Sequence, residues 1–403
     1  MARDSDGARR SGSHAGGSTL KQLATVSFVA SVLVLAACGD DGGSEKVGIV
    51  TYNIGLATGF VDYAPQRQPI VVDLVAKLDA DLVCLQEVWT QEDIDAVIDG
   101  AKDSFPHSHH VFLEDTTLGP PACTAAESDP LKACVDEKCP DTPASEIAGC
   151  ALANCNPEFS ALSPGCVECI VANIGKEVDE ILSICQTSSQ KYAYGGHSGL
   201  VLLSKHPLTQ LSHEKLSSTN VQRAVLGARV ELPVLGDTAV VCTHLAADLT
   251  GAGVPYNGPH ESWAGENTVQ AEAALAFAET LGVGADHKVL FGDMNSGPAI
   301  GDAVVAEIPE ASYQTFLDAG YVDFPTAGEG AAATSCTYCG DNSLVKSGAD
   351  VQIDRIILSA LPKKASAKVD LVGTQTVTIQ SGGADVTTHP SDHFGVRLVL
   401  ETP

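Results

Sequence analysis

Basic residues are scarce in this sequence. It contains 23 Lys and Arg against 51 Asp and Glu, which gives a net charge of −28 at pH 7. An acidic surface of this kind repels nucleic acid and anionic membranes unless basic side chains cluster locally. The composition therefore disfavours long nucleic acid as a partner.

Long apolar runs are also missing near the N-terminus. The uncharged stretch there, residues 23–37, has 15 residues, whereas a membrane-spanning helix needs about 20. Because basic residues precede it, this stretch predicts the apolar segment of a signal peptide over residues 1–37. It ends in LAAC, which resembles a bacterial lipobox, so we expect lipid on Cys38 and a polar tether over residues 38–46. The alternative is a plain signal peptide with a chance Cys38. Both predict export, and lipidation would anchor the chain to a bacterial membrane or cell surface.

Cysteine, by contrast, is abundant, with 13 in the chain. Eight fall within residues 119–190, where CVDEKCP and CALANCN repeat with a spacing of 16 residues and CVECI is an imperfect third copy. Export to an oxidising compartment favours disulfides over the alternative, a zinc-binding module, so we expect an inserted, loop-rich helical module held by disulfides. The eight cysteines are Cys123, Cys134, Cys139, Cys150, Cys155, Cys166, Cys169 and Cys185.

Four further cysteines lie outside this insertion and the N-terminal segment. CTYC, residues 336–339, predicts a short local bridge. Cys84 and Cys242 lie within apolar segments and are expected to be buried free thiols.

The rest of the chain alternates apolar, β-branched runs with stretches of helical periodicity. KVGIVTYNIG and DLVCLQEVW predict buried strands, and QPIVVDLVAKLDA between them predicts a helix, as does ENTVQAEAALAFAETLG. Further strands are predicted at GLVLLSK, VQRAVLGARVELP, TAVVCTH, KVLFGDM, QIDRIIL and FGVRLVL. The strand–helix–strand order predicts a layered α/β domain over residues 47–402, interrupted by the insertion at 119–190.

Polar residues stand at the ends of these predicted strands. In layered α/β folds the strand ends converge on one edge, where ligand sites form. One such residue would be a cap or a satisfied core group, but a whole set in the same relative place predicts a site. The set comprises Asn53, Gln86, Glu87, His244, Asp293, Asn295, Asp354, Asp392 and His393.

The residue types in this set fit one chemistry. Carboxylate and amide oxygens without cysteine suit a hard divalent cation such as Mg²⁺ or Mn²⁺. Two histidines can share acid and base roles, or contact phosphate oxygens. A neutral Asn can orient an anion that additional carboxylates would repel.

Together these segments resemble the endonuclease/exonuclease/phosphatase superfamily. The matching pieces occur in family order, and they are TYNIG, LQEVW, GHSGLVLLSK, CTHLAAD, GDMNSGP, QIDRI and SDHFGV. The resemblance covers residues 47–400 apart from the insertion. It implies a four-layer α/β sandwich, in which two mixed β-sheets pack face to face with helices outside. It also implies a metal-dependent phosphoesterase.

The resemblance implies a metal-binding group by matched position. Glu87 corresponds to the principal metal ligand, with Asn53 and Asp392 nearby. Because neighbouring residues on an extended chain point to opposite sides, we expect Asp392 to face the metal while His393 faces the phosphate.

The resemblance also implies catalytic roles. Asp293 and Asn295 correspond to the pair that orients the attacking water and the phosphate. His393 corresponds to the general base or main phosphate contact, with Asp354 as its orienting carboxylate. His244 corresponds to the second histidine, which stabilises charge or protonates the leaving oxygen.

Two further positions are weaker candidates for phosphate contact. His197 in GHSGLVLLSK occupies a place where the apurinic endonucleases carry Tyr, and Arg223 in NVQRAVLG occupies a place where a phosphate-contacting Arg is common. The alternative for both is an ordinary surface residue.

The expected substrate follows from two motifs that resemble one branch of the superfamily, the secreted sphingomyelinases, more than the apurinic endonucleases. CTHLAAD and LLSKHPL resemble the secreted sphingomyelinases, so we expect hydrolysis of a phospholipid head group or a small phosphodiester. The alternatives are an extracellular nuclease and a non-catalytic surface-binding lipoprotein. One feature argues against membrane entry, since residues 361–390 contain no Phe, Trp or Tyr.

Overall fold

The computed structural model describes residues 44–112, 117–144, 146–251, 254–346 and 350–403. The predicted signal peptide, the lipidation site Cys38 and most of the predicted tether lie outside these residues. Within the part of the chain that is described, no helix is both long enough and apolar enough to cross a bilayer.

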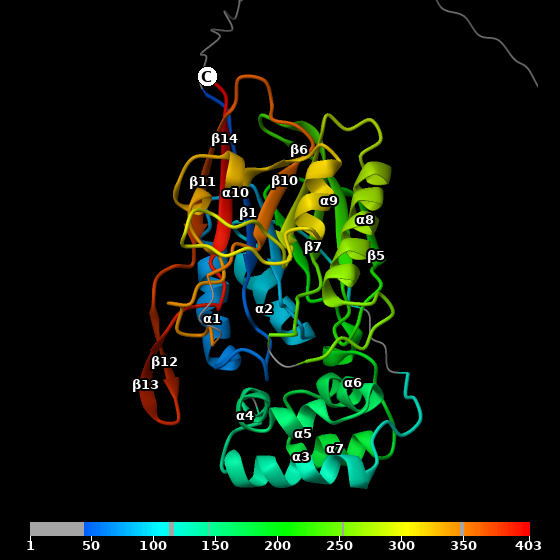
Figure 1. Ribbon diagram of the computed structural model, residues 1–403. Coiled ribbons are helices and arrows are strands. Elements are labelled where there is room, and N and C mark those ends of the chain that lie inside the picture. The colour runs from blue at the N-terminus through cyan, green and yellow to red at the C-terminus, as the bar shows by residue number, and fades with distance from the viewer. Residues whose placement is uncertain (1–43, 113–116, 145, 252–253, 347–349) are drawn as a thin grey trace, which may run out of the picture. The chain divides into compact units, whose positions relative to one another are not determined.

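Two mixed β-sheets of six strands each form the centre of the main domain (Figure 1). The first sheet contains, in spatial order, β11 (Ser366–Val372), β14 (Gly395–Glu401), β1 (Lys46–Asn53), β2 (Leu82–Gln86), β4 (Val201–Ser204) and β3 (His107–His110). The second contains β5 (Thr209–Lys215), β6 (Ala224–Leu232), β7 (Gly236–His244), β8 (His287–Asp293), β10 (Asp354–Leu358) and β9 (Val322–Asp323). The pairs β1–β2 and β7–β8 are parallel.

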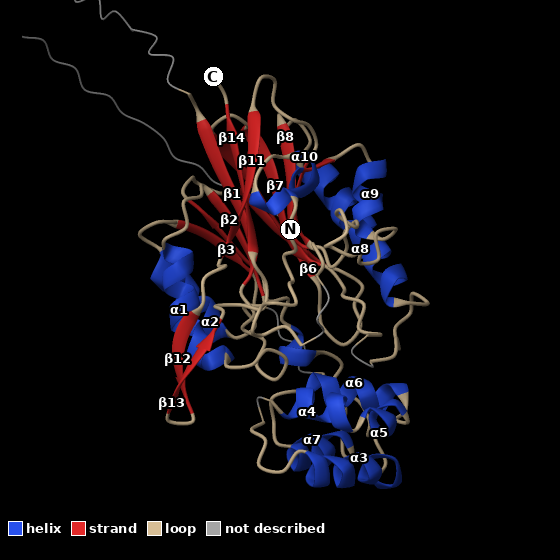
Figure 2. Cartoon of the chain, turned by 60° about the vertical axis from the view of Figure 1, so that its left-hand side comes forward, coloured by secondary structure: helices blue, strands red, loops and turns tan. Residues whose placement is uncertain are grey.

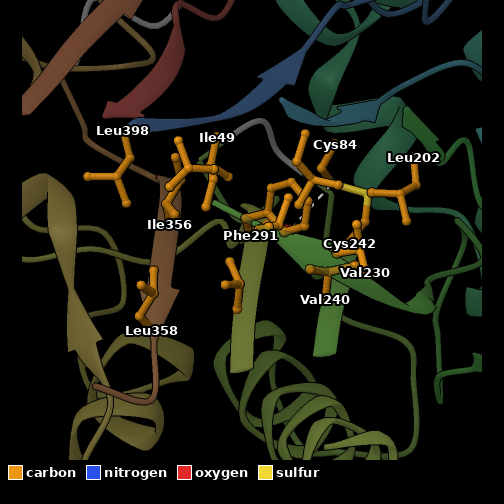
Figure 3. Close-up of a cluster of buried hydrophobic side chains, with 14 of the residues drawn as sticks. Ile49, Cys84, Leu202, Val230, Val240, Cys242, Phe291, Ile356, Leu358 and Leu398 are labelled. Carbon is orange, nitrogen blue, oxygen red and sulfur yellow. Dashed lines mark hydrogen bonds between the residues drawn. A yellow bond between two sulfur atoms is a disulfide. The ribbon is translucent and has the colours of Figure 1, made fainter. Parts of the chain in front are cut away.

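Alternation of side chains along the strands explains how the two sheets pack. Ile49 and Cys84 of the first sheet point into one buried cluster with Cys242, Phe291 and Ile356 of the second (Figure 3). The residues next to them in sequence point outward, toward helices. Both faces of each sheet are therefore covered, which accounts for the nearly continuous apolar strands.

Helices form the two outer layers (Figure 2). The first sheet is covered by α1 (Ala64–Ala76) and α2 (Gln91–Ala101), and the second by α8 (Trp263–Leu281) and α9 (Ser312–Asp318). Short elements complete the domain: η1 (Ala193–Gly196), α10 (Phe324–Ala327), η2 (Ala331–Ala333) and the hairpin β12 (Val377–Ser381)–β13 (Ala384–Thr388). The predicted four-layer α/β sandwich is confirmed.

The predicted strands and helices all occur, although their ends differ by a few residues. The strands that the sequence did not indicate are β3, β5, β9, β11, β12 and β13. Most of them lie at sheet edges or in the separate hairpin, where a strand can be polar because one or both faces meet water. Hydrophobic periodicity is therefore weak in these segments.

The insertion is a group of five short helices (Figure 1). They are α3 (Ala125–Lys138), α4 (Ile147–Asn154), α5 (Asn156–Ser160), α6 (Pro164–Ala172) and α7 (Val178–Cys185). Its cysteines pair as Cys123–Cys166, Cys134–Cys155, Cys139–Cys150 and Cys169–Cys185. The predicted internal pairing is confirmed, and these bridges leave no thiolate for the zinc alternative.

The repeat explains part of the pairing. The first cysteine of each repeat copy bonds the second cysteine of the other, in Cys134–Cys155 and Cys139–Cys150. The insertion also shares its hydrophobic cluster with Val254 and with Trp263, the first residue of α8. Deletion of residues 119–190 would therefore expose apolar surface on the main domain.

The prediction of free thiols at Cys84 and Cys242 is wrong. The two sulfurs form a disulfide between β2 and β7, so a covalent bond links the two sheets inside their shared core (Figure 3). The prediction failed because it considered each strand alone, whereas the bridge depends on two strands that face each other across the sandwich. The local bridge Cys336–Cys339 is present as predicted.

Candidate active site

The predicted strand-end residues gather at one edge of the sandwich. Asn53 ends β1 in register with Gln86 at the end of β2. His244 ends β7 in register with Asp293 at the end of β8, and Asp354 begins β10 opposite Asp293. Parallel pairing within each sheet thus aligns the strand ends, and face-to-face packing brings the two sets together.

Glu87 and Asp392 lie close enough at this edge for their charges to interact. Glu87 directly follows β2 with a φ of 62°, an uncommon backbone region for a residue with a side chain. Burial, reinforced by the nearby Asp392 carboxylate, raises the pKa of Glu87 to about 7. Within the described part of the chain, Glu87 Oε2 is buried without a hydrogen-bond partner.

Arg67 is a buried cation near this acidic group, and the sequence did not indicate it. Arg67 of α1 is fully buried, and its guanidinium donates hydrogen bonds to the backbone oxygens of Asp62, Gly55 and Pro390. It therefore ties the loop after β1 to the segment that carries Asp392. Arg67 gives no sequence signal, because a single cation in a helix is normally solvated.

Asp293 is the centre of the hydrogen-bonded group. Its Oδ2 accepts a hydrogen bond from Asn53 Nδ2 at 3.0 Å and lies 3.4 Å from His244 Nε2, while Oδ1 accepts from Asn295 N at 2.9 Å. Burial, with a further contribution from Asp354, raises the pKa of Asp293 to about 6. Asn295 is held by a hydrogen bond from its Nδ2 to Leu245 O.

His393 is held by Asp354 rather than by its neighbour Asp392. His393 Nδ1 lies 2.9 Å from Asp354 Oδ2, and His393 Nε2 lies 3.8 Å from Asp293 Oδ2. Burial alone lowers the pKa of His393, but the carboxylates of Asp354 and Asp293 outweigh it and hold that pKa well above its usual value. The hydrogen bond at Nδ1 therefore leaves His393 Nε2 facing the Asp293 carboxylate.

His244 has the opposite electrostatic environment. Burial, together with the charges of Arg223 and His393, lowers the pKa of His244 well below its usual value. Arg223 is buried near Asp293 and Glu87, and within the described chain its Nη1 has no hydrogen-bond partner. The structure therefore places Arg223 inside this site, not on the surface. The two histidines differ in their tendency to hold a proton, as acid and base groups of one site often do.

His197 and an aromatic cluster lie on neighbouring segments. His197 stacks on Phe112, with ring centroids 3.4 Å apart, so a neighbouring aromatic ring covers one of its faces. Trp89, close to Glu87, stacks on Tyr194 at 4.9 Å and lies 6.3 Å from His244 between ring centroids. Trp89 and Tyr194 were not assigned a role from the sequence, because each alone looks like an ordinary core aromatic.

The residues around Glu87 fit a divalent cation. Two buried carboxylates repel each other, and a cation at Glu87 Oε2 would relieve both that repulsion and the unpaired oxygen. Gly55 leaves the room that this requires, because a Cβ at its φ of 56° would lie 2.5 Å from Asp392 Oδ1. Asp293, Asp354 and His393 also place ligand atoms within 4.8 Å of one another. That second group already contains the His393–Asp354 hydrogen bond. Binding of the cation by Glu87, Asn53 and Asp392 stays a prediction.

Comparison with known proteins identifies the class. The sequence model of the Endonuclease/Exonuclease/phosphatase family matches residues 50–393, and the chain therefore belongs to this family. A search of curated proteins gives no significant match.

Solved structures share the fold. SmcL is 13% identical, with a TM-score of 0.53 over 89% of this chain and 99% of that chain. An endonuclease/exonuclease/phosphatase family protein from Bacteroides thetaiotaomicron is 13% identical, with a TM-score of 0.50 over 90% of this chain and 99% of that one. A beta toxin mutant from Staphylococcus aureus with bound magnesium ions is 11% identical, with a TM-score of 0.50 over 88% of this chain and 99% of that one.

Family membership supports a hydrolytic enzyme. The disulfides of the main domain and of the insertion support export to an oxidising compartment.

Proposed function

We propose that this protein is a divalent-metal-dependent phosphodiesterase that hydrolyses a phospholipid head group or a small soluble phosphodiester. The observation that carries the proposal is the convergence of three groups on one edge. These are the acidic group around Glu87, the Asp293 carboxylate, and the His393–Asp354 pair. Together they supply what in-line attack of water on a phosphodiester requires.

The residues of the site have separate roles in this reaction. When bound, Mg²⁺ or Mn²⁺ supplies positive charge that offsets the charge building up on the phosphate. Asp293, fixed by Asn53 and Asn295, orients the attacking water and takes its proton as the oxygen bonds to phosphorus. Asp354 holds His393 so that Nε2 contacts a phosphate oxygen or exchanges a proton.

Two further residues act on the phosphate side. Arg223 provides a buried donor for a phosphate oxygen, because its Nη1 has no hydrogen-bond partner among the described residues. His244 stabilises or protonates the oxygen that leaves when its bond to phosphorus breaks. His197 is a weaker candidate for phosphate contact, because its ring stacks on Phe112.

The choice of substrate rests on charge and on exposed apolar groups. A net charge of −28 disfavours long nucleic acid, which is bound through many Lys and Arg contacts to phosphate. Phe60 is 41% exposed and its ring lies 6.4 Å from that of Tyr194, so an apolar side chain is available near the site. The β12–β13 hairpin has a largely polar sequence, VTIQS and ADVTT, which disfavours deep insertion into a bilayer.

The test compares three substrates in parallel, each with Mg²⁺: sphingomyelin vesicles, a soluble head-group diester such as p-nitrophenyl phosphorylcholine, and plasmid DNA. We expect release from one or both of the first two, loss of that release on chelation, and recovery with Mg²⁺ or Mn²⁺. Glu87→Gln serves as the matched inactive protein. Rapid plasmid nicking without release from the other two would favour the nuclease, and no turnover of any substrate would favour a binding protein.

The place of action is part of the same proposal. If Cys38 carries lipid, the enzyme is held at a bacterial membrane or cell surface. Mass spectrometry of the mature N-terminus tests this, because a lipidated Cys38 adds the mass of its acyl groups. An unmodified N-terminus beyond residue 37 would instead show a plain signal peptide.

A further inference from the structure

The His393–Asp354 pair joins two different sheets. Asp354 begins β10 in the second sheet, whereas His393 lies just before β14 in the first. In the described chain these sheets are separate hydrogen-bonded ladders that meet mainly through apolar side chains, besides the Cys84–Cys242 disulfide and the Asn53–Asp293 hydrogen bond. Apolar contacts are non-directional, so they do not fix a 2.9 Å distance between two polar atoms. Neither of the two directional links touches both Asp354 and His393, so a segment that contacts both residues is needed to hold the pair.

Thr337 connects the two ends of the pair. Its side-chain Oγ1 accepts hydrogen bonds from Ile353 N at 3.0 Å and Asp354 N at 3.1 Å. Its backbone oxygen accepts a hydrogen bond from Phe394 N at 2.7 Å. Thr337 is fully buried. One residue thus holds the backbone at Asp354 and the backbone next to His393.

Tyr338 makes a second connection of the same kind. It forms bridge pairs with Val351 and with His393. Its ring centroid lies 5.1 Å from that of His393, so the tyrosine packs against the imidazole and restricts its rotation. The backbone and the ring of Tyr338 therefore both act on His393.

The Cys336–Cys339 disulfide closes the turn that contains Thr337 and Tyr338. The turn is anchored beyond the bridge by Asn342, which donates from its backbone N to Cys339 O and from Nδ2 to Ser391 O at 2.9 Å. Cys339 is 2% exposed, whereas Cys336 is only partly buried. Cys336 is therefore the more solvent-exposed residue of this bridge.

We propose that residues 336–342 are a positioning loop for the His393–Asp354 pair, and that reduction of the Cys336–Cys339 disulfide lowers turnover. Thr337 and Tyr338 are positioning residues, because they act through His393 and Asp354 without touching the substrate. In the reduction, a dithiol breaks the S–S bond and gives two electrons and two protons to the sulfurs. The dithiol itself becomes a disulfide. The inference rests on the proposed phosphodiesterase function.

The first experiment separates the Thr337 hydroxyl from its volume. Thr337→Val keeps the shape but removes the acceptor for Ile353 N and Asp354 N, whereas Thr337→Ser keeps the acceptor. We expect Thr337→Val to lower kcat by about tenfold or more with KM changed by less than about twofold, since misplacement of a catalytic group acts on the chemical step. Thr337→Ser should restore most of kcat. Equal kcat in both variants and in the wild type would overturn the proposal.

The second experiment tests the disulfide. Cys336→Ser/Cys339→Ser should lower kcat in the same way. A dithiol should lower the kcat of the wild type, and it should lower the kcat of this double variant by a smaller factor. The matched control is Cys139→Ser/Cys150→Ser, which removes a local bridge of the insertion and should retain wild-type kcat. Circular dichroism checks that both proteins are folded. If Cys336→Ser/Cys339→Ser does not fold, the comparison of Thr337→Val with Thr337→Ser tests the proposal instead.

Failure of the inference can be told apart from failure of the proposed function. A wild-type protein that hydrolyses none of the test phosphodiesters would contradict the function. An active wild type with an equally active Cys336→Ser/Cys339→Ser variant would contradict only the positioning loop.

Discussion

Removal of the bridge between Cys84 and Cys242 should destabilise the protein more than removal of a local bridge. The two cysteines are 158 residues apart in sequence and both are fully buried in the core between the sheets. Cross-linking distant residues lowers the conformational entropy of the unfolded chain, and the effect grows with the size of the closed loop.

The magnitude follows from the effective loop. Two bridges of the insertion, Cys123–Cys166 and Cys169–Cys185, close off segments of 43 and 16 residues inside it. Roughly 100 residues remain free, for which the chain-entropy relation gives about 4.7 kcal/mol. The same relation gives about 2.8 kcal/mol for Cys139–Cys150, which spans 11 residues. An unfolding entropy of about 2.1 cal/mol/K per residue, summed over residues 44–403, converts these two free energies into melting-temperature losses of about 6 °C and about 4 °C.

The assay compares Cys84→Ala/Cys242→Ala with Cys139→Ala/Cys150→Ala by non-reducing thermal melts and urea titrations. The core variant should show the larger loss, increased by the small cavity that two missing sulfurs leave between the sheets. A smaller loss for the core variant than for the control would refute the reasoning. Alkylation of the denatured, unreduced wild type gives an independent check, since labelling of Cys84 and Cys242 would show that the bridge is absent.

The remaining predictions concern the site. Glu87→Gln should lower turnover by about two orders of magnitude or more and abolish the rise in melting temperature that Mg²⁺ causes. Without metal, the same variant should melt higher than the wild type above pH 7 and equally below about pH 4. The sign follows from the raised pKa of Glu87, because a buried carboxyl with a folded pKa of about 7 loses stability as the pH rises toward that value. His244→Ala and His393→Ala should each lower kcat by about 100-fold, and the double variant should lose less than the product, because both act on one transition state. Near-normal kcat in either folded single variant would contradict its assignment.

Local patterns in the sequence determined the layers and most of the site. Runs such as KVGIVTYNIG and VLFGDM are apolar on both faces, so they predict strands buried in a layered α/β fold wherever they lie in the chain. The polar residues that end neighbouring strands, Asn53 and Gln86 in one sheet and His244 and Asp293 in the other, then lie together at the sheet edge, because aligned strands end together. The insertion was visible for the same reason, since its cysteine spacing repeats within a short segment.

Tertiary structure alone decided the features that depend on contacts between distant segments. The Cys84–Cys242 bridge and the contact of Thr337 with Asp354 and Phe394 connect strands or loops that sequence patterns treat separately. Arg67 is set apart from other helical cations only by its burial against three backbone oxygens. The opposite pKa shifts of His244 and His393 likewise arise from burial and from which charges face each ring. Hydrophobic periodicity encodes which side of a strand is buried, but it carries no information on which residue of another strand lies opposite.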